Sequence, residues 1–148
     1  MITAVFLLVL LVAPLSLFIH EWGHVFFGLA FRSECSTLQL GRGYRIIDVR
    51  SRKFRLVICL FFFQGAFSIN EREPSFTRQE QGWISFGGPL FNIGAAGLVW
   101  PLLGIHIFWS LLFWFNLYLA VANMIPFTVN GRKSDGCHVW SSFRRHGG

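Results

Sequence analysis

Charged side chains are scarce in this chain of 148 residues: they make up 14% of it, hydrophobic residues make up 53%, and the mean hydropathy is +0.52. Soluble domains carry about 25% charged residues, so this composition favours a chain that resides in lipid. It also excludes disorder, collagen-like repeats and coiled coils. Cys35, Cys59 and Cys137 are odd in number and contain no CxxC pair. They indicate reduced thiols rather than a disulfide framework or a cysteine-based zinc site.

The few charges are unevenly distributed and divide the chain into four blocks. Residues 1–31 contain a single charged side chain, Glu21, and residues 83–131 contain none. Residues 32–82 hold nine Lys/Arg against five Asp/Glu, and residues 132–148 hold four against one. We interpret the two apolar blocks as membrane segments and the two basic blocks as aqueous segments.

Three apolar segments are long enough to cross a bilayer, at about residues 2–31, 83–103 and 106–125. The first would form a helix of roughly 45 Å, longer than the roughly 30 Å hydrocarbon core, with Pro14 as a candidate kink. Three spans place both basic blocks on one side, which the positive-inside rule identifies as the cytoplasm. A signal peptide is the alternative at the N-terminus, but a basic n-region and an A-x-A-like cleavage site are both missing.

Residues 32–82 are too polar to span and predict a small β-sheet near the cytoplasmic membrane face. Two strand-like segments, 36–41 and 44–50, flank the turn signal Gly41-Arg42-Gly43. A second turn signal lies at residues 51–53. Both turns contain residues that favour tight bends of the backbone, so a hairpin-based sheet is expected here.

The run of eight apolar residues at 56–63 is too short for a membrane helix. It suits a strand that is buried on both faces. A polar linker over residues 70–81 would then lead to the second span. The predicted fold class is therefore membrane α-helical, with three core transmembrane helices and a small membrane-associated β-sheet between the first and the second.

The first apolar segment carries the motif His20-Glu21-Trp22-Gly23-His24. Residues four apart share one face of a helix, about 6 Å apart along its axis, so both imidazoles can bind one tetrahedral zinc ion. A carboxylate beside them can hold and deprotonate a metal-bound water, which makes Glu21 a candidate general base. An acid near the centre of a membrane helix costs about 2.5 to 3.5 kcal/mol. Zinc binding, at roughly 10 to 16 kcal/mol in small peptides, is sufficient to offset that cost.

A catalytic zinc needs a third protein ligand and an open position. Seven apolar residues separate His24 from Arg32, which places the site on the order of 10 Å below the cytoplasmic boundary. Asp135, after the third span, is the best candidate for the third ligand, although an aspartate before glycine also suits a simple turn. The rival donors are Cys137, His138 and His106.

Together these residues resemble the site-2 protease family of intramembrane zinc metalloproteases. The similar segments are HEWGH at residues 20–24, GGPLFN at residues 87–92, and Asn123-x-x-Pro126 with Asp135-Gly136, which are similar to the family's HExxH, glycine-proline-asparagine and Asn-x-x-Pro…Asp-Gly motifs. One departure stands out: eight residues separate Pro126 from Asp135, where the family's commonest form has four. A PDZ or CBS module is not recognisable, so we expect a single catalytic core over residues 1–148, either minimal or truncated.

The resemblance implies that His20, His24 and Asp135 bind Zn²⁺ and that Glu21 is the general base. The implied function is hydrolysis of peptide bonds in transmembrane or membrane-associated protein substrates by zinc-activated water. The alternative is a non-hydrolytic metal-binding membrane protein, either a degenerate relative that binds helices or a metal carrier. The intact Glu21 and the lack of charge in residues 83–131 argue against that alternative.

The resemblance also implies that Asn92 and Asn123 lie near the cleft, as candidates for contacting unwound substrate; hydrogen bonding between helices is the alternative. It places Gly41 and Gly43 in a hairpin whose edge can receive substrate as an added strand, or which is a plain turn. The predicted partners are the substrate and the lipid bilayer. Nucleic acid is not expected, because basic residues do not interleave with exposed aromatics in a stripe. We expect a multi-pass protein of the cell membrane with its active site open to the cytoplasm, and make no prediction of its oligomeric state.

Overall fold

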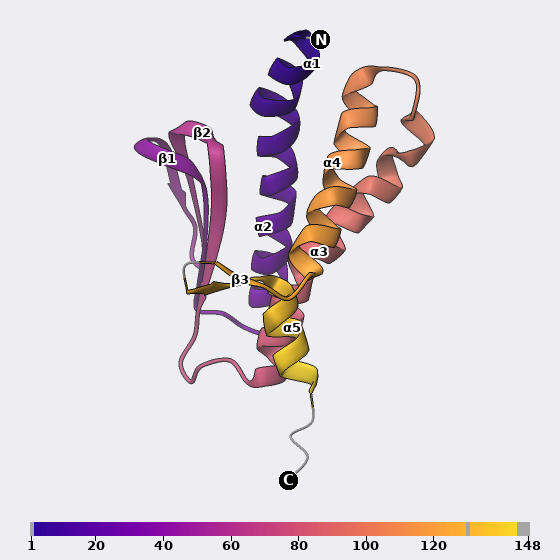
Figure 1. Cartoon of the computed structure of the whole chain (residues 1–148). Coiled ribbons are helices and arrows are strands. Elements are labelled where there is room, and N and C mark those ends of the chain that lie inside the picture. The colour runs from indigo at the N-terminus through magenta and orange to yellow at the C-terminus, as the bar shows by residue number, and fades with distance from the viewer. Residues whose placement is uncertain (1, 130, 145–148) are drawn as a thin grey trace.

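The computed structural model describes residues 2–129 and 131–144 of the chain. A bundle of helices stands beside a long β-hairpin (Figure 1). The elements follow the order α1 (Ile2–Leu7), the π-helical η1 (Leu8–Val12), α2 (Ala13–Ala30), β1 (Cys35–Arg50), β2 (Phe54–Glu71), α3 (Arg78–Val99), the 3₁₀ turn η2 (Trp100–Leu102), α4 (Ile107–Met124), β3 (Thr128–Val129), β4 (Arg132–Lys133) and α5 (Asp135–Phe143).

The first helical segment runs from Ile2 to Ala30, as the predicted first span requires. Pro14 does not end it. Proline lacks an N–H and crowds the carbonyl four residues earlier, and the turn before it, Leu8–Val12, is widened into a π-helix, which accommodates such a defect. Within the described residues, this segment and α4 are the two helices long and apolar enough to cross a membrane. Only 17% of the most apolar 18-residue stretch of the first segment is buried, so most of its nonpolar surface faces outward.

α3 begins at Arg78, earlier than the predicted second span, because its N-terminus is capped. The Thr77 side chain accepts a hydrogen bond from the Glu80 N–H at 3.3 Å, and the Glu80 carboxylate accepts one from the Thr77 N–H at 2.7 Å. This reciprocal capping box satisfies two N–H groups that a helix start otherwise leaves free. Arg72 donates to both Glu80 oxygens, at 2.9 and 2.7 Å, and to the Phe31 carbonyl at 2.7 Å, which joins the end of α2 to the start of α3.

The polar linker predicted over residues 70–81 is shorter than expected. β2 continues through Glu71, and α3 starts at Arg78, so only residues 72–77 connect the two elements. The linker was predicted to begin at residue 70 because the side chains at the end of β2 are polar. They are retained in the strand because Asn70 uses its side chain to dock the strand on α2, where its Nδ2 donates to the His24 carbonyl at 3.1 Å.

β1 and β2 pair antiparallel, with Cys35 opposite Glu71 and Arg50 opposite Arg55. The turn predicted at residues 51–53 is confirmed. The turn predicted at Gly41-Arg42-Gly43 is also confirmed. Both flanking segments belong to β1, but the chain reverses between them: residues 36–40 and 47–50 each pair with residues 54–58, in opposite directions. Gly41 has φ +81°, and a Cβ on it would lie 2.4 Å from the Phe62 Cα, so glycine permits both the reversal and the close approach of β2.

The apolar run 56–63 forms part of β2, but it is not buried on both faces as predicted. Val57 and Cys59 are buried, whereas Leu60 is 50% exposed and Phe61 is 43% exposed. Side chains alternate between the two faces of a strand, and this burial pattern is that of a sheet with one covered face. The hydrophobicity of the other face therefore needs a different explanation from core packing.

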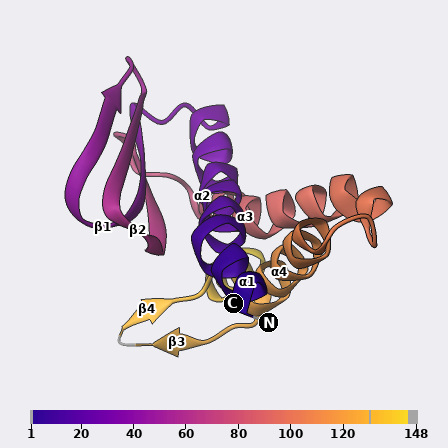
Figure 2. The same ribbon diagram turned by 90° about the horizontal axis from the view of Figure 1, so that it is seen from above.

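Seen from above, the β1–β2 hairpin lies on one side of α2, whereas α3 and α4 lie on the other (Figure 2). α2 and α3 approach each other at glycines: a Cβ on Gly23 would lie 2.2 Å from the Gly87 carbonyl oxygen. Small residues of this kind allow close packing of membrane helices. An apolar cluster joins the first helical segment to α3 and α4 and consists of Val12, Ala96, Val99, Leu112 and Phe113.

Candidate metal centre

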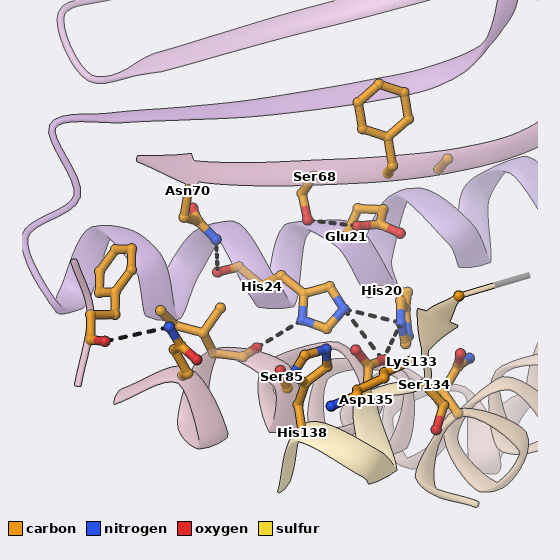
Figure 3. A pocket seen from close by; sticks show the side chains of 17 residues that line it. His20, Glu21, His24, Ser68, Asn70, Ser85, Lys133, Ser134, Asp135 and His138 are labelled. Atoms are coloured by element: carbon orange, nitrogen blue, oxygen red, sulfur yellow. Dashed lines mark hydrogen bonds and ion pairs between the residues drawn. The ribbon is translucent and has the colours of Figure 1, made fainter. Parts of the chain in front are cut away.

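Three side chains from two distant parts of the chain converge on one point (Figure 3). His20 and His24 lie one turn apart on α2, and Asp135 is the first residue of α5. The His20 Nε2 atom lies 3.2 Å from the His24 Nε2 atom and 3.1 Å from the Asp135 Oδ2 atom, and His24 Nε2 lies 3.5 Å from that oxygen. Ligands of a tetrahedral zinc ion, each about 2.1 Å from the metal, lie about 3.4 Å from one another. The donor set therefore fits zinc in residue type and spacing.

Both imidazoles are oriented by hydrogen bonds at the ring nitrogen that faces away from the site. His24 Nδ1 lies 2.7 Å from the Ile84 carbonyl oxygen, and His20 Nδ1 lies 2.6 Å from the Asn92 Oδ1 atom. A carbonyl oxygen only accepts, so Nδ1 of His24 carries the proton and its Nε2 lone pair points at the site. Partners of this kind fix the orientation of metal-binding histidines and raise their basicity.

Asp135 reaches the histidines because its flanking residues lock α5 against the end of α4. The Ser134 hydroxyl donates to the Ile125 carbonyl at 2.8 Å and caps α5 by accepting from the Cys137 N–H at 3.3 Å. A Cβ on Gly136 would lie 2.1 Å from the Met124 carbonyl oxygen, so glycine is needed for this contact. The unusually long loop before Asp135 is taken up by the short β3–β4 hairpin.

Asp135 is mostly buried, and its environment favours the carboxylate form. Burial alone raises the pKa of the Asp135 carboxyl, but in the metal-free site hydrogen bonds from protonated His20 and His24 outweigh that effect and lower the pKa to about 2. A carboxylate at this position is the protonation state that metal binding requires. The aspartate starts a helix, so it is more than the plain turn residue that its Asp-Gly sequence allowed.

Glu21 lines the same cavity of about 990 Å³ as the three donors. Its Oε2 atom accepts a hydrogen bond from the Ser68 hydroxyl of β2 at 2.6 Å. Ser68 thus links the sheet to the residue expected to act as the base. Sequence reasoning missed Ser68, because the alignment of β2 with α2 is a tertiary feature and an isolated serine in a strand carries no signal of its own.

The two asparagines of the predicted substrate site lie in different environments. Asn123 lines the cavity, and its Nδ2 donates to the Leu119 carbonyl of its own helix at 2.9 Å. Asn92 has no exposed surface, and its amide contacts His20, Ser16 and Asn116. That burial favours the alternative that Asn92 hydrogen-bonds between helices.

The other predicted site residues are separate from the three donors. Gly41 and Gly43 lie at the bend of β1 and do not line the cavity, whereas Ala66, Phe67 and Ser68 of β2 do. Of the rival metal donors, His138 lines the cavity, Cys137 Sγ contacts the Phe127 carbonyl at 3.3 Å, and His106 caps the start of α4. His20, His24 and Asp135 are the group of metal-binding side chains found together in the described part of the chain.

Comparison with known proteins gives one result that bears on this site. The sequence model of peptidase family M50 matches residues 5–107, well over half of the chain. The match includes His20, Glu21, His24 and Asn92, and it ends before Asn123 and Asp135. A search of curated proteins returned no significant match.

Proposed function

The chain belongs to peptidase family M50, the membrane-embedded metallopeptidases of the site-2 protease type, and from this premise we propose that it is an intramembrane zinc endopeptidase. The observation that carries the proposal is the convergence of His20, His24 and Asp135 in one cavity beside Glu21. Glu21 is the one charged residue in the helical segment Ile2–Ala30. Zinc, when bound there, lowers the pKa of water and polarises a carbonyl group.

Glu21 is assigned the proton transfers of peptide hydrolysis. Its carboxylate accepts the proton of the attacking water and returns it to the amine of the leaving fragment. The Ser68 hydroxyl holds the Oε2 atom of Glu21, which leaves Oε1 for this exchange. The two imidazoles, held by Asn92 and by the Ile84 carbonyl, would bind the zinc together with Asp135.

The substrate class proposed is a transmembrane or membrane-associated protein segment. A transmembrane helix must unwind before one of its peptide bonds can be attacked, and each backbone group exposed in this way needs a new partner. β2 would supply such partners, because the extended backbone of Ala66, Phe67 and Ser68 lines the cavity. An unwound substrate would pair with this segment as an added strand. Asn123 on the same wall is the candidate side-chain contact.

We further propose that α3 is a third core span and that the protein is a multi-pass component of the cell membrane. The segment 32–34, the linker 72–77 and α5 lie at one end of the bundle, and the N-terminus and the α3–α4 turn lie at the other (Figure 1). The positive-inside rule assigns the end with the basic residues to the cytoplasm, so the cavity would open on that side. The exposed apolar side chains of β1 and β2 are suited to contact with lipid rather than water.

Cleavage itself is tested by comparing membrane-protein fragments from cells that produce the wild type, Glu21→Gln or Glu71→Gln. Glu71 is an exposed acid at the end of β2, outside the cavity, and serves as the matched control. General acid–base groups contribute about 10²- to 10⁴-fold to rate, so fragments should disappear with Glu21→Gln and persist with Glu71→Gln.

Metal content of the same purified proteins separates the two candidate functions. Glu21→Gln should retain one zinc per chain, because the three donors are unchanged. If the wild type and Glu21→Gln yield identical fragments while both hold zinc, the non-hydrolytic metal-binding alternative is favoured and the endopeptidase proposal fails.

A further inference from the structure

A layer of buried polar side chains lies next to His20. Ser16 of α2, Asn92 of α3 and Asn116 of α4 all have no exposed surface. They contact one another: Asn92 Nδ2 lies 2.6 Å from Asn116 Oδ1, and Asn116 Nδ2 lies 2.9 Å from Ser16 Oγ. Asn116 and Ser16 contribute no metal ligand, and Asn116 lies outside the segment that the family model matches.

The orientation of the Asn92 amide is fixed by a backbone group. Its Nδ2 atom lies 3.2 Å from the Ser16 carbonyl oxygen, which can only accept a hydrogen bond. The NH₂ group of Asn92 must therefore face Ser16 and Asn116, and its Oδ1 atom must face His20. An oxygen at 2.6 Å from the His20 Nδ1 atom requires the proton to be on Nδ1.

The same reasoning fixes the Asn116 amide. Its Nδ2 atom lies 2.8 Å from the Leu112 carbonyl oxygen, again a group that only accepts. The Oδ1 atom of Asn116 is then the acceptor for Asn92. Two backbone carbonyls, one on α2 and one on α4, thus determine the direction of every hydrogen bond between Asn116 and His20.

We propose that Asn116 and Ser16 are positioning residues for the metal centre, which act through Asn92 to hold His20 as the Nδ1–H tautomer with its Nε2 lone pair directed at the zinc site. The inference rests on the proposed metal centre but does not depend on peptide hydrolysis. It assigns α4 a role at the site, although α4 supplies no ligand.

His24 provides an internal reference for this proposal. Its Nδ1 proton is held by the Ile84 carbonyl, a backbone group that no side-chain substitution removes. A change in the polar layer should therefore alter the tautomer of His20 and leave that of His24 unchanged. General loosening of the bundle would affect both rings.

The test uses the full chain in lipid nanodiscs with ¹⁵N-labelled histidine, measured without metal by the ring nitrogen shifts and with zinc by competition against a chelator. Asn116→Leu removes the acceptor of Asn92. It should produce a second His20 tautomer and weaken zinc binding about 10-fold, the lower end of the loss seen when an outer-shell partner of a metal ligand is removed.

Two further variants separate positioning from packing. Asn116→Asp, protonated in this buried layer, keeps an oxygen for Asn92 and an O–H for the Leu112 carbonyl, so it should restore the His20 shifts and the zinc affinity. Leu112→Ala removes an apolar neighbour one turn away and should leave both unchanged.

The wild type alone can overturn the proposal, even if a variant does not fold. The proposal fails if the His20 Nδ1 atom, which faces Asn92, carries no proton in the metal-free wild-type protein. It also fails if Asn116→Leu keeps wild-type His20 shifts and zinc affinity. A chain that holds zinc with the expected tautomer yet cleaves no substrate would refute the proposed peptidase and leave the positioning role intact.

Discussion

The three long helices meet at two neighbouring levels that are built from different chemistry. At one level an apolar cluster fills the space between them, with Val12, Ala96 and Phe113 among its members. About one turn further along, the polar layer of Ser16, Asn92 and Asn116 fills the corresponding space next to His20. Apolar contacts have no preferred direction and tolerate changes that keep the volume, whereas each hydrogen bond demands a donor and an acceptor in line.

The polar layer explains how the metal-binding side chains are held in one arrangement. In the described residues, every buried side-chain nitrogen and oxygen has a hydrogen-bond partner, so the polar layer is fully satisfied. A satisfied polar network rigidifies its surroundings and specifies one arrangement. Changes at the metal-centre level should therefore alter metal binding more than stability, and changes in the apolar cluster should do the reverse.

The largest effect on metal binding is expected from Asp135→Ala. This change removes one of three protein ligands and leaves two imidazoles facing each other at 3.2 Å. Zinc affinity should fall more than about 100-fold, beyond the 10- to 100-fold loss typical of outer-shell changes. Metal content after dialysis against a chelator is the measurement. Asp48→Ala, which removes an exposed carboxylate paired with Arg55, is the control and should retain zinc.

A smaller effect on metal binding is expected from Gly88→Ala. A Cβ on Gly88 would lie 2.6 Å from the His24 Nε2 atom and 2.7 Å from the His20 Cε1 atom. Neither ring can move away without lengthening its Nδ1 hydrogen bond, so zinc affinity should fall about 10-fold.

The control for that variant is Gly97→Ala on the same helix, where an added Cβ meets nothing within 4 Å. It should bind zinc like the wild type and be slightly more stable, because alanine has the higher helix propensity. Equal zinc affinity of the two alanine variants would show that the imidazoles are not held as tightly as the geometry indicates.

Much of the metal centre could be predicted from the sequence, because His20, Glu21 and His24 form a local pattern. Helical periodicity alone places the two imidazoles on one face. Asp135 is 115 residues away from His20. Its place after the third span makes it the best candidate among the acids, and the family resemblance implies the same role, but the capping by Ser134 that brings it into place could not be predicted. The location of Ser68 beside Glu21 depends on strand register, which is set by long-range pairing rather than by local sequence.

The glycines at residues 41 and 43, both with positive φ, correctly predict the reversal of the chain within β1. The burial of the next strand was predicted less well. The run 56–63 was assigned to a buried strand because its residues are apolar. In a membrane protein an apolar side chain can also face lipid, so hydrophobicity alone does not indicate burial.

In the apolar cluster, Phe113→Ala should reduce stability without changing metal affinity. Phe113 is 6% exposed and packs against Trp100 with ring centroids 5.5 Å apart. In lipid the transfer part of the hydrophobic effect is largely absent, so the loss should be that of packing, about 1 to 2 kcal/mol. Unfolding of the metal-free protein in detergent measures the stability, and chelator competition measures the affinity. If Phe113→Ala lost as much zinc affinity as Gly88→Ala, the apolar cluster and the polar layer would not differ in their effect on metal binding.

The smallest effect is expected from a polar contact that water can reach, the Arg72–Glu80 ion pair at the start of α3. The hydrogen bond from Arg72 lowers the pKa of the Glu80 carboxyl from 4.5 to about 2, with help from the Thr77 N–H. A carboxyl whose pKa is lowered on folding stabilises the fold fully above its unfolded pKa and loses that contribution as the pH falls through its folded value. The contribution of Glu80 should therefore be complete above about pH 4.5 and vanish near pH 2.

This contribution is measured as the difference in melting temperature between wild type and Glu80→Gln across that pH range, both metal-free so that loss of ligands does not intervene. Because solvent screens the pair, the difference should be smaller than that caused by Phe113→Ala. It should also fall with added salt, whereas the buried layer of Ser16, Asn92 and Asn116 contains no charge for salt to screen. A difference that persists unchanged at pH 2 would mean that Glu80 acts through packing or neutral capping rather than through its charge.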